Sequence, residues 1–434
     1  MKSTQTKSKS PSRRAPRPVR VPPPLTRGEE KFEGASVLTE FDGEFGILLW
    51  QSLRNVMLWS ATDPARRKGL FSPGADERRR VKLLSTEVDD ALRAPLAVIA
   101  RLLADPAGAD RRRVTTACLK IAEWAENRDS LATALAFTQA AALSGTNDAR
   151  ISYSVGRLAR KRAEYPRAET WFRRAILLGR QGGDWESYAL AFVGLGNLYA
   201  QRGNLTAAQK SQLRAYRAAK RKGLRNVQGL ALHDLFTVAV KRNQTREAEE
   251  LAASALRAYG VGHPRLPFFA HDVAVFWINQ GFYGPALTVL SALQPHFQKP
   301  TEQALVLANI ARAAAGANDM YRYKEAWQAA SSLVANTEAT EGVASIYIAL
   351  ANSAEAAGEW DDRATAAKHA VRLANARDEA GIKAMAEAHL EDVSKGLRST
   401  TEPAPDSEPW IAGHADVLAD SFAKSLQVVG VAAR

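Results

Sequence analysis

Small residues recur every 40 positions in this sequence, and no other feature restricts the fold as strongly. Ala168, Ala208 and Ala248 are separated by 40 residues each. Two antiparallel helices approach to about 8 Å only where their side chains are small, so such positions mark helix crossings. Internal repeats of this length predict stacked helical hairpins. The same interval separates three further alanines and two glycines: Ala175, Ala215 and Ala255, and Gly156 and Gly196.

The best-formed unit resembles a known repeat family. It carries Leu195-Gly196, Tyr199, Gly203-Asn204, Ala208 and Ala215 in order. This pattern is similar to the tetratricopeptide repeat superfamily, in the variant with repeats of about 40 residues found in bacterial regulatory and signalling scaffolds. The resemblance implies an all-α, right-handed superhelical solenoid of about seven helix pairs that binds proteins or peptides. The preceding unit supports it with Gly156, Tyr165, Ala168, Phe172 and Ala175.

Composition and periodicity divide the chain into segments. Leu49, Val56 and Trp59 recur at helical spacing, and Val81, Leu84, Leu92 and Leu103 continue the pattern in a predicted N-terminal helical cap. The expected segments are a basic Pro-rich disordered tail at 1–35, the cap at 36–105, the repeat array at 113–377, a closing helix at 378–397, a linker at 398–410 and an amphipathic C-terminal helix at 411–434. The last helix, with Trp410, Ile411, Leu418, Phe422 and Leu426 on its apolar stripe, either caps the array or mediates self-association.

The pair Gly194-Leu195-Gly196 does not form a nucleotide-binding loop. A dinucleotide fingerprint needs a preceding strand and a third glycine at the position that Tyr199 occupies, and the residues before Gly194 continue a helix. No Walker sequence, Gly-x-Ser-x-Gly elbow or His-Glu-x-x-His pair is present. We therefore expect no cofactor and no enzymatic activity.

First helices of this repeat family line a ligand groove, and the repeat register maps the groove onto a basic, hydrogen-bonding surface. Arginine favours bidentate contact with carboxylate or phosphate, and asparagine can hold a peptide backbone. The prediction is a groove for a protein or peptide, with acidic character. The alternative is a set of solvated surface charges. The predicted groove residues are Arg150, Tyr153, Arg157, Arg160, Lys161, Asn197, Gln201, His233, Thr237, Lys241, His271 and Asn279.

The formal net charge of +13 is uneven. Residues 1–31 hold nine Lys or Arg against Glu29 and Glu30, which suits either a solubilising tail or an arm for nucleic acid. A second basic cluster spans 214–225, where Arg214, Arg217 and Arg221 share one predicted helix face. These three either contact phosphates or simply occupy an exposed helix end. Nucleic-acid association through the tail and this helix is thus the second function that the sequence suggests.

The cysteine count, the histidine positions and the hydropathy argue against disulfide-rich, zinc-binding and membrane-spanning proteins. The single cysteine, Cys118, excludes a disulfide framework and is expected to be a core residue. His233 and His271 occupy like positions in adjacent units, about 10 Å apart, which is too far for one zinc ion. No apolar run approaches the roughly 18 residues of a membrane span. With no signal peptide recognised either, we expect a cytoplasmic protein without a membrane partner.

Overall fold

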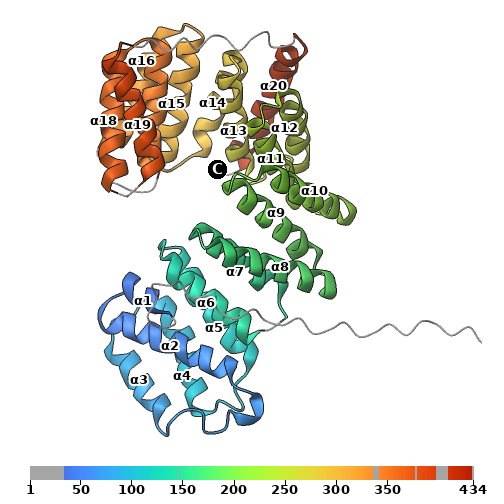
Figure 1. The fold of residues 1–434 in the computed structure, drawn as a ribbon, viewed down its shortest axis with the longest axis vertical. Coiled ribbons are helices and arrows are strands. Elements are labelled where there is room, and N and C mark those ends of the chain that lie inside the picture. Colours follow the sequence, from blue (N-terminus) through green and yellow to red (C-terminus); the bar gives the residue numbers. More distant parts are fainter. Residues whose placement is uncertain (1–33, 146, 336–341, 377–378, 397–408, 433–434) are drawn as a thin grey trace, which may run out of the picture. The chain divides into compact units, whose positions relative to one another are not determined.

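Seven helical hairpins form the centre of the chain (Figure 1). The computed structural model describes residues 34–145, 147–335, 342–376, 379–396 and 409–432, and every regular element in these ranges is helical. The all-α fold of stacked helix pairs that the sequence predicted is confirmed. The hairpins pair α5 (Arg111–Glu126) with α6 (Leu131–Ser144), α7 (Ala149–Lys161) with α8 (Tyr165–Gly182), α9 (Trp185–Gln201) with α10 (Leu205–Lys222), α11 (Arg225–Lys241) with α12 (Thr245–Tyr259), α13 (Leu266–Asn279) with α14 (Tyr283–Leu293), α15 (Pro300–Gly316) with α16 (Met320–Ala335), and α17 (Val343–Ala357) with α18 (Trp360–Ala376).

Every hairpin turns in the same way. In each turn, a residue one to three positions past the end of the first helix adopts a left-handed backbone conformation. The residue after it donates its N–H to a carbonyl five residues back, as in a Schellman motif. In the turn between α9 and α10, Gly203 has φ 76° and Asn204 N–H donates to the Tyr199 carbonyl. The Asn204 side chain then caps α10 by accepting the Ala207 N–H at 3.0 Å. The seven left-handed residues are Asp129, Ala163, Gly203, Asn243, Gly281, Asn318 and Gly358.

The small residues of the repeat lie at helix contacts, as the sequence predicted. Ala168, Ala208 and Ala248 are fully buried. A Cβ on Gly194 would lie 2.3 Å from the Phe172 ring of α8, and one on Gly156 would lie 2.7 Å from the same ring. These glycines therefore admit Phe172 between two first helices, and the Gly194 region is confirmed as packed helix.

Four helices precede the array, and α19 (Ala380–Ser394) follows it. The four are α1 (Ala35–Glu40), α2 (Gly43–Ala61), α3 (Ala75–Ser85) and α4 (Asp90–Ala104). Two short 3-10 turns also occur in the described chain, Pro64–Arg66 after α2 and Gln294–His296 after α14. The predicted stripe of this region is correct for Leu49, Val56 and Trp59, which are buried. It is wrong for Val81 and Leu84, which are 61% and 79% exposed. The reason is that α3 is a separate short helix that buries only Leu83.

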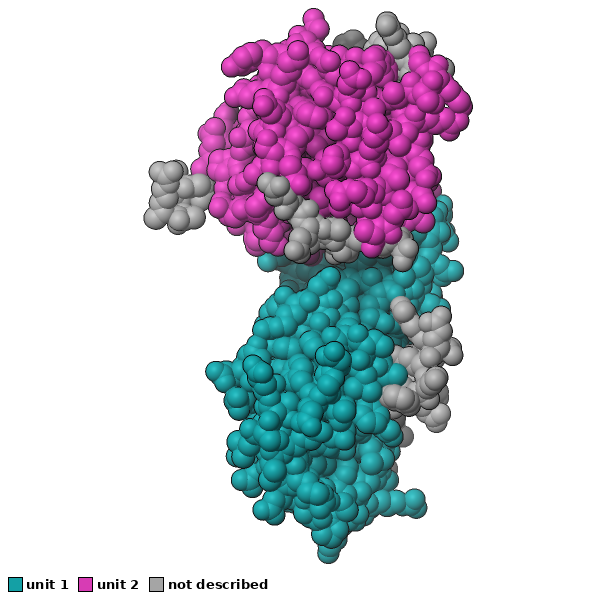
Figure 2. Space-filling model, turned by 90° about the vertical axis from the view of Figure 1, so that its left-hand side faces the viewer, with its two compact units in different colours: residues 1–227 teal, residues 228–434 magenta. Residues whose placement is uncertain are grey.

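The chain divides into two compact units, residues 1–227 and 228–434 (Figure 2). Unit 1 holds α1 to α10, and unit 2 holds nearly all of α11 and the helices that follow it. Residues 1–33 of the predicted tail, residues 398–408 of the predicted linker, and the side chains of Trp410 and Ile411 lie outside the residues that are described, whereas Ala35 and Pro409 begin α1 and α20.

The C-terminal helix α20 (Pro409–Ala432) packs against α12, α13 and α14, far back along the sequence of unit 2 (Figure 1). Phe422 is fully buried there, with its ring 5.7 Å from Phe269 and 6.4 Å from Trp277 between centroids. The fully buried Glu249 accepts a 2.5 Å hydrogen bond from Trp277 Nε1 and lies 3.3 Å from His414 Nδ1 of α20. A carboxylate thus joins α12, α13 and α20.

The glycine contacts generate a stability prediction. Gly194→Ala should lower the free energy of unfolding by roughly 1–3 kcal/mol, because the new methyl group overlaps the Phe172 ring. The matched control is Gly182→Ala in α8, where a Cβ meets nothing within 4 Å and should be neutral or stabilise by up to about 1 kcal/mol. Urea denaturation followed by circular dichroism measures both. Equal stability of the two variants would contradict the packing role of Gly194.

The buried Glu249 generates a pH prediction. Burial raises its pKa above the ordinary value of 4.5, with hydrogen bonds from Trp277 and His414 opposing. The stabilising protonated form is therefore fully present below pH 4.5 and is lost as pH rises through the raised pKa. Glu249→Gln should match wild type at pH 4.5 and be more stable at pH 8, by about 1 kcal/mol. Glu250→Gln, at an exposed neighbour on α12, should show no such pH dependence in the same urea titrations.

Candidate functional site

The common turn places one residue of each first helix in an equivalent position. Six residues before the left-handed residue, the side chain projects on the face of the first helix that the repeat register assigns to the groove. Sequence analysis had placed Arg157, Asn197 and Thr237 there, and it did not select the first member of the series or the last three. The full series is Glu123, Arg157, Asn197, Thr237, Val275, Arg312 and Asn352.

In unit 2 this face is hollowed into a groove, which we call the unit 2 groove. It runs over α13, α15, α17 and α19 and encloses about 680 Å³, including space open to solvent. Its apolar lining includes Leu305, Ile348 and Met385, the last being 54% exposed. Its polar lining includes His271 of the predicted groove and three residues that the sequence analysis did not select: Asn309, Arg312 and Asn352.

Arg312 is a half-buried cation in this groove. Burial lowers its pKa, and attraction to Glu355 and Tyr283 opposes the change. Arginine nevertheless stays protonated, because its ordinary pKa is so high. Among the described residues, Arg312 has no hydrogen-bonded or ion-paired partner, and neither does the Asn352 amide. The groove therefore offers a guanidinium and an amide to whatever enters it.

Glu355 does not neutralise Arg312, because a second arginine holds it. Arg363 of α18 is 1% exposed, and its Nη2 lies 3.5 Å from the Glu355 carboxylate. The same guanidinium donates to His389 Nδ1 at 3.0 Å and to Asp392 at 2.9 Å, both on α19. Burial and the nearby Arg363 lower the pKa of His389, which fits its role as a neutral acceptor. This cluster fixes α19, and with it Met385, at the edge of the groove.

His233 and His271 share one carboxylate. Asp272 Oδ2 lies 2.8 Å from His233 Nε2 of α11, and Oδ1 lies 3.6 Å from His271 Nδ1. Burial raises the pKa of Asp272, but hydrogen bonds from the two histidines outweigh it and lower the pKa to about 2. His271 Nε2 in turn lies 3.1 Å from the Asn309 amide nitrogen. Asp272 and His271 of α13 thus orient the Asn309 amide of α15. Sequence analysis did not select Asp272, which lies at the centre of this network.

Within the described ranges, no group of three His, Cys, Asp or Glu side chains is arranged to hold a metal ion. Cys118 is fully buried, and burial raises its thiol pKa to about 12. The thiol is accordingly inert at neutral pH.

In unit 1 the first-helix face is basic but partly paired. Glu126, at the end of α5, accepts hydrogen bonds from both Arg157 nitrogens at 2.5 and 2.6 Å and from Lys161 at 3.1 Å. Hydrogen bonding from Arg157, with Lys161 assisting, lowers the pKa of Glu126 to about 2 although burial opposes it. Arg157 and Lys161 therefore tie adjacent hairpins together, and the sequence analysis had not identified Glu126 as their partner.

The remaining predicted residues vary in their surroundings. The Asn197 side chain accepts a 3.0 Å hydrogen bond from Gln212 of α10, and Tyr153 lies 6.0 Å from the Phe172 ring. The Thr237 hydroxyl donates to a carbonyl of its own helix, and Arg160 is half-buried. The exposed members are Arg150, Gln201, Lys241 and Asn279 on first helices, and Arg214, Arg217 and Arg221 on α10.

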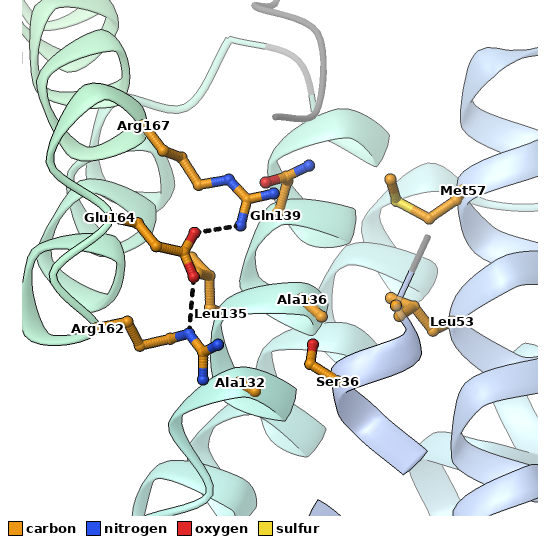
Figure 3. A pocket seen from close by; sticks show the side chains of 11 residues that line it. Ser36, Leu53, Met57, Ala132, Leu135, Ala136, Gln139, Arg162, Glu164 and Arg167 are labelled. Carbon is orange, nitrogen blue, oxygen red and sulfur yellow. Dashed lines mark hydrogen bonds and ion pairs between the residues drawn. The ribbon is translucent and has the colours of Figure 1, made fainter. Parts of the chain in front are cut away.

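A smaller pocket lies in unit 1 beside α1, α2, α6 and the start of α8 (Figure 3). Glu164 bridges Arg162 at 2.9 Å and Arg167 at 2.7 Å, as the dashed lines show. Glu40 approaches Arg162 at 3.9 Å and accepts two backbone N–H groups at the start of α6. The charges of this pocket are thus balanced internally, in contrast to Arg312 in the unit 2 groove.

None of the described helices combines the length and the apolarity that crossing a membrane requires.

No family model matches the sequence, and no curated protein matches it either. Among solved structures, the chain is similar to BtubC (BKLC) from P. vanneervenii at 14% identity and a TM-score of 0.40, over 52% of this chain and 91% of that one. A Rap protein complexed with competence and sporulation factor aligns at 9% identity and a TM-score of 0.36, over 82% and 98% of the two chains. A circular tandem repeat protein aligns at 13% identity and a TM-score of 0.15, over 90% and 99% of the chains. Likenesses at these TM-scores carry no argument about function.

The Glu126 cluster generates a second pH prediction. Because Arg157 depresses the pKa of Glu126, the ion pair stabilises unit 1 fully above pH 4.5 and is lost as pH falls toward 2. Glu126→Gln should lower the free energy of unfolding at pH 6 by roughly 1–3 kcal/mol, and the loss should vanish near pH 2. Urea titrations at several pH values measure this. Glu123→Gln, exposed on the same helix, is the control. A deficit that persists unchanged at pH 2 would contradict the assignment.

Proposed function

We propose that this helical-repeat protein is a non-catalytic scaffold or sensor that binds a peptide segment bearing a carboxylate in the unit 2 groove. One observation carries the proposal: Arg312 lines the groove as a half-buried cation, and Glu355, the carboxylate that attracts it, is held by Arg363. A guanidinium in this state binds a carboxylate more strongly than an exposed one, because little solvent screens the pair.

The rest of the lining suits a peptide. Asn309 and Asn352 present amides from neighbouring first helices, and an amide can both donate to and accept from a peptide backbone. Leu305, Ile348 and Met385 supply apolar surface for side chains, and methionine adapts to varied shapes. A nucleic acid would find a single cation here, which makes a peptide the better match.

The finer assignments belong to the same proposal. The turn and alanine register resembles the tetratricopeptide repeat in its variant of about 40 residues, whose members commonly bind peptides on first helices. A cytoplasmic location, the absence of catalysis and a contribution of the basic unit 1 face to binding are expectations that accompany it. On that face the position six residues before the turn holds Arg157 and Asn197 in the second and third hairpins.

The test uses a synthetic library of random octapeptides with free C-terminal carboxylates, selected against the full chain. Selected peptides should lose about 10- to 100-fold in affinity for Arg312→Met, because a charge-assisted hydrogen bond is removed. Asn352→Ala should weaken binding by about 5- to 10-fold through loss of one neutral hydrogen bond. Isothermal titration calorimetry measures both variants.

Arg372→Met is the matched control, since Arg372 is exposed on α18 and should leave affinity unchanged. Amidating the C-terminus distinguishes a terminal carboxylate from an acidic side chain as the ligand of Arg312. The proposal is overturned if the selected peptides bind Arg312→Met and the wild-type chain equally.

A further inference from the structure

Helix α10 (Leu205–Lys222) carries six cations and no acidic residue. Four of them, Lys210, Arg214, Arg217 and Arg221, follow each other by one helical turn and are all exposed. We call these four residues the α10 basic face. The face belongs to unit 1 and is independent of the proposed peptide groove.

Packing directs these cations outward. The opposite side of α10 is buried through Ala208, Gln212, Ala215 and Ala219, which contact the body of unit 1. Turning the helix to hide the cations would expose this small-residue seam. The packing of α10 therefore keeps these four positions on the exposed side of the helix.

The charges of the α10 basic face are uncompensated. On other second helices an arginine is paired one turn away: Arg173 with Glu169 at 2.7 Å on α8, and Arg246 with Glu250 at 3.5 Å on α12. None of the four α10 residues has a carboxylate within ion-pair distance in the part of the chain that the structure describes. Cations at a helix C-terminus are favoured by the dipole, but that effect is confined to the last turn, and three of the four lie before it.

The chemistry of the face selects its partner. Protein interfaces are built around buried apolar anchors, and no large apolar side chain of α10 is exposed. Single-stranded nucleic acid needs free aromatic rings for base stacking. Here each ring beside the face is already approached by a cation: Lys222 lies 4.4 Å from the Trp185 ring centroid, Lys220 lies 5.7 Å from that of Tyr216, and Arg214 lies 5.8 Å from that of Phe192. An evenly spaced line of cations without apolar or stacking groups matches a phosphate backbone.

We propose that the α10 basic face docks onto the phosphate backbone of a nucleic-acid duplex without reading its sequence. The partner's evenly spaced phosphates supply the negative charges that α10 lacks. Binding of this kind releases counterions and weakens steeply as salt rises.

The test compares two full-length variants with the same change in net charge. One is Arg214→Glu/Arg217→Glu/Arg221→Glu, and the other replaces three exposed cations of unit 2, Lys299→Glu/Lys368→Glu/Arg372→Glu. Fluorescence anisotropy with a mixed-sequence DNA duplex at several salt concentrations is the measurement. The α10 variant should bind at least about ten-fold more weakly, and its slope of log K against log salt should fall by about 2 to 3. The control variant keeps the basic tail and should change affinity by less than about three-fold.

A triple glutamine variant at the same α10 positions should give an intermediate loss, and circular dichroism confirms that all variants are folded. The proposal is overturned if the wild-type chain does not bind the duplex at about 50 mM salt, where phosphate contacts are strong. It is also overturned if the two triple glutamate variants lose the same affinity. The third contrary result is that poly-glutamate competes as effectively as the duplex at equal charge.

Discussion

The close approach of paired helices at alanine and glycine positions is the constraint on which the rest of this structure depends. A ring such as Phe172 enters the stack only because Gly156 and Gly194 carry no side chains where it lies. The left-handed turn residue then fixes how far each second helix is rotated against its first helix. Once both are set, the residue six positions before the turn faces the groove side in every hairpin. Function can therefore change by substitution at that position without disturbing the packing.

The two units use this common position differently. In unit 1, Arg157 is engaged by Glu126 of the preceding hairpin, so its charge stabilises the stack. In unit 2, the corresponding Arg312 lacks such a partner among the described residues because Glu355 is held by Arg363. The same residue type at the same position thus serves cohesion in one unit and is available for recognition in the other. The difference lies in which neighbouring hairpin supplies a carboxylate.

Periodicity revealed the packing of this protein but not its charge pairing. The alanines at 168, 208 and 248 were predictable because steric limits act within one hairpin and repeat with it. Glu126 and Asp272 were not, because each pairs with a residue of an adjacent hairpin and no spacing in the sequence encodes that contact. Arg312 and Asn352 escaped detection for a simpler reason: small residues mark the register less clearly beyond Ala286, and only the turn geometry restores it. The helical pattern also could not show that α20 would pack on α12 to α14, because an apolar stripe predicts burial but does not specify which helices cover it.

The end of the array follows from the same register. Five residues after the left-handed turn residue, the first five hairpins place alanine, and the last two place Tyr323 and Arg363. Both side chains are buried, and a buried guanidinium requires anionic or neutral acceptors close by. Asp392 and His389 supply them from α19, and Glu355 supplies a carboxylate from α17. Without α19, Arg363 would keep only Glu355 and would lose His389 and Asp392. The charge at this one position therefore ties α19 to the end of the array, where Ile382 and Met385 form the outer wall of the groove.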